Sequence, residues 1–243
     1  MGIINGKDFI DRLNKLENEI WFDGEKIKEE ISEQPVFKGV LKAKASLYDL
    51  QNDPALNEEM TFFLPYKEEP IGLSYLQPKT KEDLKRRRMM EHWAKITHGI
   101  MGRSPDYMNT VVMSFASSSA ILKDRDNCFP VNILSLYERA MDHDLSFTHT
   151  FITPQVNRSQ VYLGFSNEPI SAKGVDRNEK GLVIKGARLL ATQDGLTDEV
   201  LVFPAPRVFF DPSEAFAFSI PSNTKGQYSL NTPLNWILFT YVP

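Results

Sequence analysis

Cysteine is nearly absent from this sequence, since Cys128 is the only one among 243 residues. A single thiol excludes a disulfide within the chain, and it excludes the cysteine-rich ligand sets of structural zinc and iron–sulfur sites. Cys128 stands at the head of an apolar helical pattern with no evident base beside it in the sequence. Packing in the core is therefore a better interpretation of Cys128 than nucleophilic catalysis.

Long apolar runs are missing as well. No stretch approaches the length of about 20 apolar residues that an uninterrupted transmembrane helix needs. The first seven residues, MGIINGK, lack the charged and then apolar pattern of a secretory signal. These absences predict a cytoplasmic protein that makes no contact with a membrane.

Positive charge is not in excess, because 28 Lys and Arg residues face 32 Asp and Glu residues, for a net charge of −4. Binding to the phosphates of a nucleic acid needs a basic surface, so we expect no nucleic-acid partner. The run Lys85–Arg88 is the local exception. Four consecutive helical residues point nearly all the way round a helix, so the run indicates a solvated, salt-bridging helix.

The common catalytic motifs are absent too. The sequence has no G-x-G-x-x-G after a strand, no G-x-x-x-x-G-K-[ST], no H-E-x-x-H and no G-x-S-x-G. Its histidines, at positions 92, 98, 143 and 149, do not follow the spacing of metal ligands, and the first two face different ways on one predicted helix. We therefore predict no metal site, and generic motifs leave the function open.

What the sequence does contain is a change of period near residue 144. Before that point apolar residues recur at helical spacing, and after it short segments alternate with a period of two. This order predicts an α+β fold rather than repeated βαβ units. The pattern predicts helices at 8–16, 36–51, 80–100, 105–122 and 129–142, a hairpin at 20–27, and strands at 147–153, 160–165, 181–192, 199–203 and 215–220.

The loop Gly102–Tyr107, between two predicted helices, is the first candidate site. Ser104 suits the N-cap position, Pro105 the first helical position and Asp106 the first turn. Arg103 then lies just outside a helix N-terminus, beside Tyr107 on its first turn. An arginine and a phenol at the positive end of a helix are suited to binding an anion or a phenolate. The alternative is that Arg103 only ties the loop to a neighbouring carboxylate.

The predicted strand 147–153 supplies the second candidate, His149. Alternation predicts that His149 shares one face of the strand with Phe147 and Phe151. Taken alone, His149 is more readily read as a hydrogen-bonded strand histidine, and Thr192 as a polar residue that ends a strand.

Three separated segments in the same order resemble one family. They are Gly102–Tyr107, Thr148–Gln155 and Ala191–Glu199. The sequence resembles the large component of 4-hydroxyphenylacetate 3-monooxygenases, a family of reduced-flavin-dependent aromatic hydroxylases. The resemblance implies an acyl-CoA-dehydrogenase-like fold, in which an N-terminal helical domain precedes a β-barrel-like, antiparallel β domain.

The resemblance also implies roles for individual residues. Arg103, Tyr107 and His149 match the catalytic residues that surround the phenolic hydroxyl of the substrate. The cofactor is FAD, supplied reduced by a separate flavin reductase, and O2 is the second substrate. The positions that match flavin-contacting residues are Thr153, Pro154, Gln155 and Thr192.

The resemblance extends to about Lys225 and covers only the N-terminal half of a family member. Relatives continue into a C-terminal helical bundle that completes the flavin site and builds a homotetramer. We therefore expect domains at 1–144 and 145–226, and a non-family tail at 227–243 that carries no charged residue, as after a frameshift. A truncated hydroxylase is the first interpretation, and a non-catalytic remnant or interaction module that retains the N-terminal fold is the alternative. The related iron–sulfur dehydratases are set aside because the chain lacks cysteine ligands.

Overall fold

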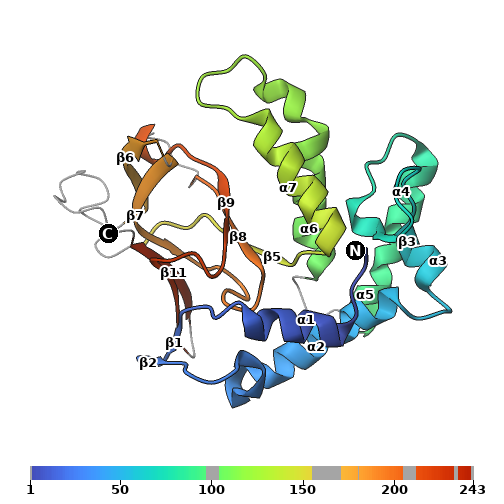
Figure 1. Cartoon of the computed structure of the whole chain (residues 1–243), viewed down its shortest axis with the longest axis horizontal. Helices are drawn as coiled ribbons and strands as arrows, with labels where there is room; N and C mark the ends of the chain where they lie inside the picture. Colours follow the sequence, from blue (N-terminus) through green and yellow to red (C-terminus); the bar gives the residue numbers. More distant parts are fainter. Residues whose placement is uncertain are drawn as a thin grey trace. The chain divides into compact units, whose positions relative to one another are not determined.

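The computed structural model describes residues 2–96, 104–154, 171–179, 181–204, 212–232 and 235–241. The chain divides into two compact units, both drawn in Figure 1. One, which we call the helical unit, contains Met1–Lys15 and Glu30–Ser146. The other, the sheet unit, contains Leu16–Glu29 and Phe147–Pro243. The predicted change from helices to strands near residue 144 is confirmed, and the predicted domain limits at 144 and 226 stay a prediction.

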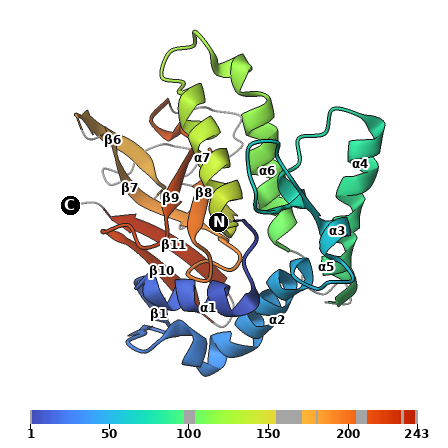
Figure 2. The same cartoon turned by 45° about the vertical axis from the view of Figure 1, so that its right-hand side comes forward.

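Helices dominate the helical unit. They are α1 (Gly6–Lys15), α2 (Pro35–Gln51), α3 (Asn57–Met60), α4 (Lys81–Arg87), α5 (Glu91–Ile96), α6 (Pro105–Ser117) and α7 (Pro130–His143). Short 3-10 helices join them: η1 (Ile31–Glu33), η2 (Leu73–Tyr75), η3 (Arg88–Met90) and η4 (Ser119–Leu122). Strands β3 (Thr61–Phe62) and β4 (Ile71–Gly72) form an antiparallel pair in this unit. Figure 2 shows α6 and α7 side by side.

The core of the helical unit follows from its apolar pattern. Phe9 of α1 is fully buried and stacks on Tyr48 of α2, with ring centroids 4.7 Å apart. Trp93 of α5 is also buried, and its indole N–H donates to the carbonyl oxygen of Leu47 at 2.8 Å. Burial of aromatic rings is a large favourable term when their polar atoms find partners, as the Trp93 indole does here.

The helix predicted at 80–100 begins where the sequence indicates but does not continue unbroken. Thr80 and Asp83 form a reciprocal capping box at its start. The helix then passes through η3, and α5 ends at Ile96. The basic run is only partly solvated, because Arg87 is half-buried and donates to the carbonyl oxygens of Ser74 and Leu76, each at 2.7 Å.

The sheet unit carries most of the strands. They are β1 (Ile20–Phe22), β2 (Glu25–Lys26), β5 (Phe147–Thr150), β6 (Lys173–Asn178), β7 (Gly181–Leu189), β8 (Glu199–Val202), β9 (Phe218–Pro221), β10 (Gln227–Thr232) and β11 (Asn235–Tyr241), with η5 at Pro212–Glu214. The predicted hairpin turns at Asp23 and Gly24, whose φ angles of 50° and 84° suit a two-residue hairpin loop. The strand predicted at 160–165 lies outside the described residues.

The described strands form open sheets. The larger sheet has the order β2-β1-β10-β11-β7-β6, and the smaller has the order β5-β8-β9. Two pairs are parallel, β1 with β10 and β5 with β8. For the part of the chain that the structure describes, the predicted barrel-like form is therefore wrong, whereas the predicted antiparallel pairing holds for most strand pairs but not for these two. Parallel pairing arises because β1 and β5 are followed by long excursions before their partner strands.

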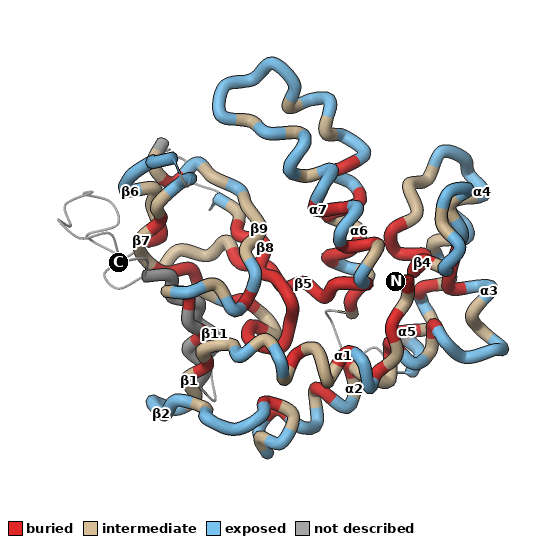
Figure 3. Tube along the Cα trace, viewed as in Figure 1, coloured by how far each residue is buried: buried red, intermediate tan, exposed pale blue. Residues whose placement is uncertain are grey.

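The segment after residue 226 is part of the larger sheet. β10 pairs with β1 on one side and with β11 on the other, and β11 pairs with β7. In Figure 3 the reddest run of the sheet unit follows β5 and β8, which are buried along their whole length. The buried interior of this unit is thus centred on the strand that carries His149.

Candidate functional site

The N-terminus of α6 holds the part of the predicted site that lies in the helical unit. Ser104 occupies the N-cap position and Pro105 the first helical position, as predicted. The Ser104 hydroxyl does not cap the helix, however, and donates instead to Oδ1 of Asp106 at 2.5 Å. Tyr107 follows on the first turn with 45% of its surface exposed.

Arg87 is a neighbour of this corner that sequence reasoning missed. Its guanidinium donates to Oγ1 of Thr110 at 2.6 Å, one turn along α6 from Asp106. Burial raises the pKa of the Asp106 carboxyl, although the Ser104 hydroxyl and the charge of Arg87 oppose that shift. The basic run contained the only sequence signal for Arg87, and that run was interpreted as solvated.

Two predicted site residues fall outside the described residues. They are Arg103, the proposed cation of the phenol site, and Gln155, a proposed flavin contact. The roles given to them stay predictions. The other predicted residues of the second and third segments all lie in the sheet unit.

His149 lies on β5 and is buried, with 7% of its surface exposed. Its imidazole stacks on Phe151, with centroids 5.6 Å apart and an interplanar angle of 15°, and it lies 6.5 Å from the ring of Phe203. The prediction that His149 and Phe151 share one face is consistent with this stacking. The imidazole of His149 is thus packed between the rings of Phe151 and Phe203.

The opposite face of β5 holds the segment that contains Thr192. The hydroxyl of Thr148 donates to the carbonyl oxygen of Thr192, and the hydroxyl of Thr150 donates to that of Leu189 at 2.7 Å. Side chains alternate across a strand, so these two threonines point away from His149. One short strand therefore joins the histidine to the third family-like segment.

The segment around Thr192 has an unusual backbone. Leu190, Gln193 and Gly195 adopt positive φ angles of 63°, 67° and 77°. Such angles are unfavourable for leucine and glutamine, and backbone strain of this kind gathers at functional sites. Glycine suits position 195, because a φ angle of 77° lies in the left-handed region that residues with a Cβ rarely adopt. Thr192 is half-buried between these strained positions.

Asp194 in the same turn is an acid that the sequence did not single out. It is buried, and loss of hydration raises the pKa of its carboxyl to about 6, although hydrogen bonds from Ser229 and the amide of Gly195 oppose the shift. The Gly195 amide donates to Oδ1 of Asp194 at 3.0 Å. The carboxyl of Asp194 therefore stabilises this turn by accepting a hydrogen bond from its backbone.

Thr153 and Pro154 lie shortly beyond the end of β5, after Phe151 and Ile152, and are half-buried. Oγ1 of Thr153 accepts a hydrogen bond from Nη1 of Arg188 at 2.8 Å. The backbone continues to pair beyond the strand, since the amide of Leu189 donates to the carbonyl oxygen of Ile152 at 2.8 Å. Thr153 and Thr192 are thus both held next to the end of β7.

The described residues include no group of three or more His, Cys, Asp and Glu side chains that could hold a metal ion. A shallow hollow of about 450 Å³ in the helical unit is lined by Tyr66, Lys67, Asp142 and His143 among others, and it contains none of the predicted site residues. None of the described helices combines the length and apolar character that crossing a bilayer requires.

Comparison with known families bears directly on these segments. The family model described as "4-hydroxyphenylacetate 3-hydroxylase N terminal" matches residues 5–233. The chain belongs to this hydroxylase family. The match includes all three segments that carried the resemblance, and it extends through β10.

Individual relatives of this chain carry names that agree with this family. A probable 4-hydroxyphenylacetate 3-monooxygenase of Bacillus subtilis (strain 168) is 72% identical over 227 residues, which are 93% of this chain and 47% of the relative. The oxygenase component of a 4-hydroxyphenylacetate 3-monooxygenase of Thermus thermophilus is 41% identical over 91% of this chain and 45% of the relative. The chain thus spans about half the length of the curated relatives it matches.

Solved structures match the fold of this family member over nearly its whole length. The oxygenase component of 4-hydroxyphenylacetate 3-monooxygenase, crystallised with FAD and 4-hydroxyphenylacetate, gives a TM-score of 0.86 at 34% identity, covering 98% of this chain and 52% of that one. An archaeal 4-hydroxybutyryl-CoA dehydratase gives a TM-score of 0.79 at 19% identity, a likeness of fold alone.

Proposed function

We propose that this chain serves in the hydroxylation of a phenolic ring, ortho to its hydroxyl group, with reduced FAD and O2. A separate flavin reductase supplies the reduced cofactor. The observation that carries the proposal is the arrangement on β5, in a chain of this family. His149 lies on one face of the strand, and the hydroxyls of Thr148 and Thr150 hold the strained segment of Thr192 on the other.

The residues present fit a flavin. Thr153 and Thr192 offer half-buried hydroxyls near the end of β7, and residues 190, 193 and 195 have positive φ angles. An isoalloxazine ring carries carbonyl oxygens and ring nitrogens along its edge, which need such polar partners. Thr153, Pro154, Gln155 and Thr192 would hold the ring, which when bound supplies the oxygen chemistry.

The substrate phenol is bound through its hydroxyl group in this proposal. Arg103 contributes a positive charge, and Tyr107 and His149 contribute hydrogen bonds, so that the phenol gains phenolate character. Hydroxylation ortho to a phenol is helped by that negative charge, and a cation with two hydrogen-bond partners stabilises it. The stacked rings of His149 and Phe151 keep water away from this end of the strand.

Equilibrium dialysis of the purified chain against reduced FAD, without oxygen, tests the cofactor assignment. We expect saturable binding. Absence of saturation would refute flavin use by this chain and favour the alternative of a non-catalytic module that retains the N-terminal fold, an alternative motivated by its covering about half of its relatives.

The phenol assignment is tested with 4-hydroxyphenylacetate, reduced FAD and O2, measuring catechol formation against oxygen consumed. We expect His149→Ala to abolish product formation and to leave FAD binding unchanged within about twofold, since the proposed partner of His149 is the substrate. Tyr107→Phe removes only one hydroxyl and should reduce product formation less. Product formation by His149→Ala at the wild-type rate would remove the histidine from the mechanism.

A further inference from the structure

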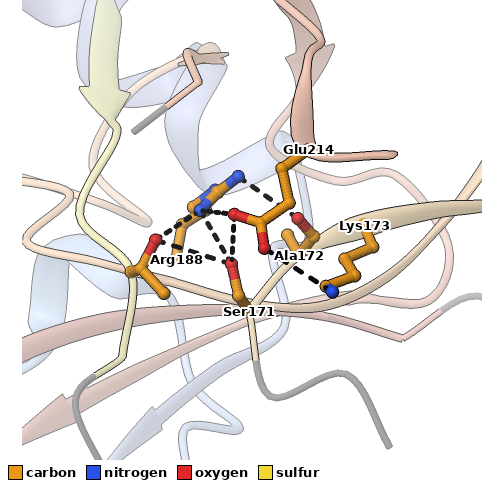
Figure 4. A network of polar contacts seen from close by, with 6 residues as sticks. Ser171, Ala172, Lys173, Arg188 and Glu214 are labelled. Atoms are coloured by element: carbon orange, nitrogen blue, oxygen red, sulfur yellow. Dashed lines mark hydrogen bonds and ion pairs between the residues drawn. The ribbon is translucent and has the colours of Figure 1, made fainter. Parts of the chain in front are cut away.

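A buried group of polar side chains joins four separate segments of the sheet unit (Figure 4). Arg188 of β7 lies at its centre with 1% of its surface exposed. Its Nη1 donates to Oγ1 of Thr153 at 2.8 Å and to Oγ of Ser171 at 2.9 Å, and its Nη2 donates to the carbonyl oxygen of Ala172 at 3.2 Å. A buried arginine with this many directed bonds is fixed in one position.

Charge and packing fix the guanidinium further. Oε2 of Glu214, from η5, lies 3.8 Å from Nη1 of Arg188, and Oε1 lies 3.7 Å from Nζ of Lys173. The ring of Phe216 lies 5.5 Å from the guanidinium carbon of Arg188. A buried carboxylate beside a buried arginine offsets part of the loss of hydration. At 3.8 Å the Glu214 carboxylate is an ion-pair partner of Nη1 rather than a hydrogen-bond acceptor.

The backbone is shaped to admit this contact. Gly186 has a φ angle of 121°, and a Cβ there would lie 2.5 Å from the carbonyl oxygen of Ser171. Glycine at this position therefore lets β7 approach Ser171 closely. Without that approach the hydroxyl of Ser171 would not lie within reach of Arg188.

The direction of the hydrogen bonds at Thr153 follows from the chemistry of arginine. A guanidinium has only donors, so Oγ1 of Thr153 must be the acceptor of the bond from Arg188. The hydroxyl of Ser171 accepts from Arg188 and lies 3.2 Å from Oε2 of Glu214, to which it donates, and its contact with Oγ1 of Thr153 is longer, at 3.5 Å. The hydrogen of the Thr153 hydroxyl is therefore left for a partner outside the group.

We infer that Arg188 is a positioning residue that makes Thr153 a hydrogen-bond donor to the acceptor edge of the flavin ring. Arg188 itself does not touch the flavin. The inference rests on the proposed function, because it takes Thr153 to be a flavin contact. Glu214 and Ser171 act one step further away, by holding the guanidinium in place.

A pair of substitutions at Thr153, made with and without Arg188, tests this role. Thr153→Ser keeps the hydroxyl and Thr153→Val removes it. Equilibrium dialysis measures the affinity of each variant for reduced FAD. When Arg188 is present, we expect the Thr153→Val variant to bind FAD about tenfold more weakly than the Thr153→Ser variant, the usual effect of losing one directed hydrogen bond. In the Arg188→Met background the two should bind within about twofold of each other, because the hydroxyl is no longer oriented.

Arg177→Met is the matched control, since Arg177 is exposed on β6 in the same unit, and we expect it to keep the tenfold difference. Should Arg188→Met fail to fold, Glu214→Gln replaces it, with a reduced Ser-to-Val difference expected. A difference that persists undiminished in these backgrounds would overturn the inference while leaving flavin binding established. Absence of FAD binding by the wild-type chain would overturn the proposed function, and the inference with it.

Discussion

The interiors of the two units are built differently. The helical unit is filled mainly by large apolar and aromatic side chains such as Phe9, Tyr48 and Trp93, and buries fewer charged groups, among them Lys44 and Asp144. The interior of the sheet unit contains ionisable side chains, including His149, Arg188, Asp194 and Glu214, beside a small apolar cluster around Val200. Buried polar groups favour one arrangement of partners, whereas apolar packing tolerates several. The predicted flavin contacts lie in the sheet unit, whose interior contains more of these directional polar contacts.

The two units also differ in how they present the predicted phenol-binding residues. Tyr107 is 45% exposed on α6, and His149 is 7% exposed on β5. An exposed phenol on a first helical turn contributes little to the stability of its own unit. His149 is held by aromatic neighbours, so its position is set by the fold of the sheet unit.

The largest change in stability is expected for a substitution in the apolar core of the helical unit. Phe9→Ala should lower the free energy of unfolding by about 3–5 kcal/mol, because it leaves a cavity against Tyr48. Urea unfolding followed by circular dichroism measures it. Phe63→Ala, at a phenylalanine that is 62% exposed, is the matched control and should change stability by less than about 0.5 kcal/mol. Equal effects of the two substitutions would contradict the role of Phe9 in the apolar core of the helical unit.

The next prediction concerns the buried acid of the sheet unit. The folded-state pKa of Asp194 is raised from 3.8 to about 6, so the protonated form is favoured by folding. Its contribution to stability is complete below about pH 4 and is lost as the pH rises through 6, by up to about 3 kcal/mol. Asp194→Asn should therefore remove a fall in stability between pH 4 and 7.

Urea unfolding at several pH values, for the wild type and Asp194→Asn, provides the measurement. Asp126→Asn, at an exposed aspartate, serves as the control and should follow the wild-type profile. Parallel profiles for the wild type and Asp194→Asn would show that the carboxyl does not titrate in this range.

A smaller effect is expected at the threonines of β5. Thr148→Val keeps the shape of the side chain but leaves the carbonyl oxygen of Thr192 without its donor, which should cost about 1–2 kcal/mol. The amide of Asp194, which donates to Ala191 within the strained turn, should then exchange its hydrogen faster. Hydrogen exchange read by NMR would detect this, and unchanged exchange would mean that Thr148 does not hold the turn.

The smallest effect is expected at the exposed start of α4. Thr80→Ala removes the capping box with Asp83 and should destabilise the helical unit by about 1 kcal/mol. Thr80→Ser retains the cap and should restore stability. Thermal unfolding of both variants makes the comparison, and an Ala variant as stable as the Ser variant would assign the cap no energetic role.

Local signals in the sequence predicted local structure well. The helix start predicted at residue 80, the helix start predicted at Pro105 and the hairpin predicted at 20–27 are all present. These features depend on residues within three or four positions of one another, whose backbone preferences are intrinsic. The family-like segments likewise indicated which residues to place in the candidate site before their surroundings were known.

The sequence by itself thus determined the order of helices before strands, the helix starts and turns, and membership of the hydroxylase family. Only the tertiary structure decided that the sheets are open, that Arg87 turns inward, and that Thr148 and Arg188 hold Thr192 and Thr153. The partners in these last two contacts are 44 and 35 residues apart. A hydroxyl or a guanidinium carries no sequence signal for a partner so distant, because the strand pairing that joins them is selected by the packing of the whole unit.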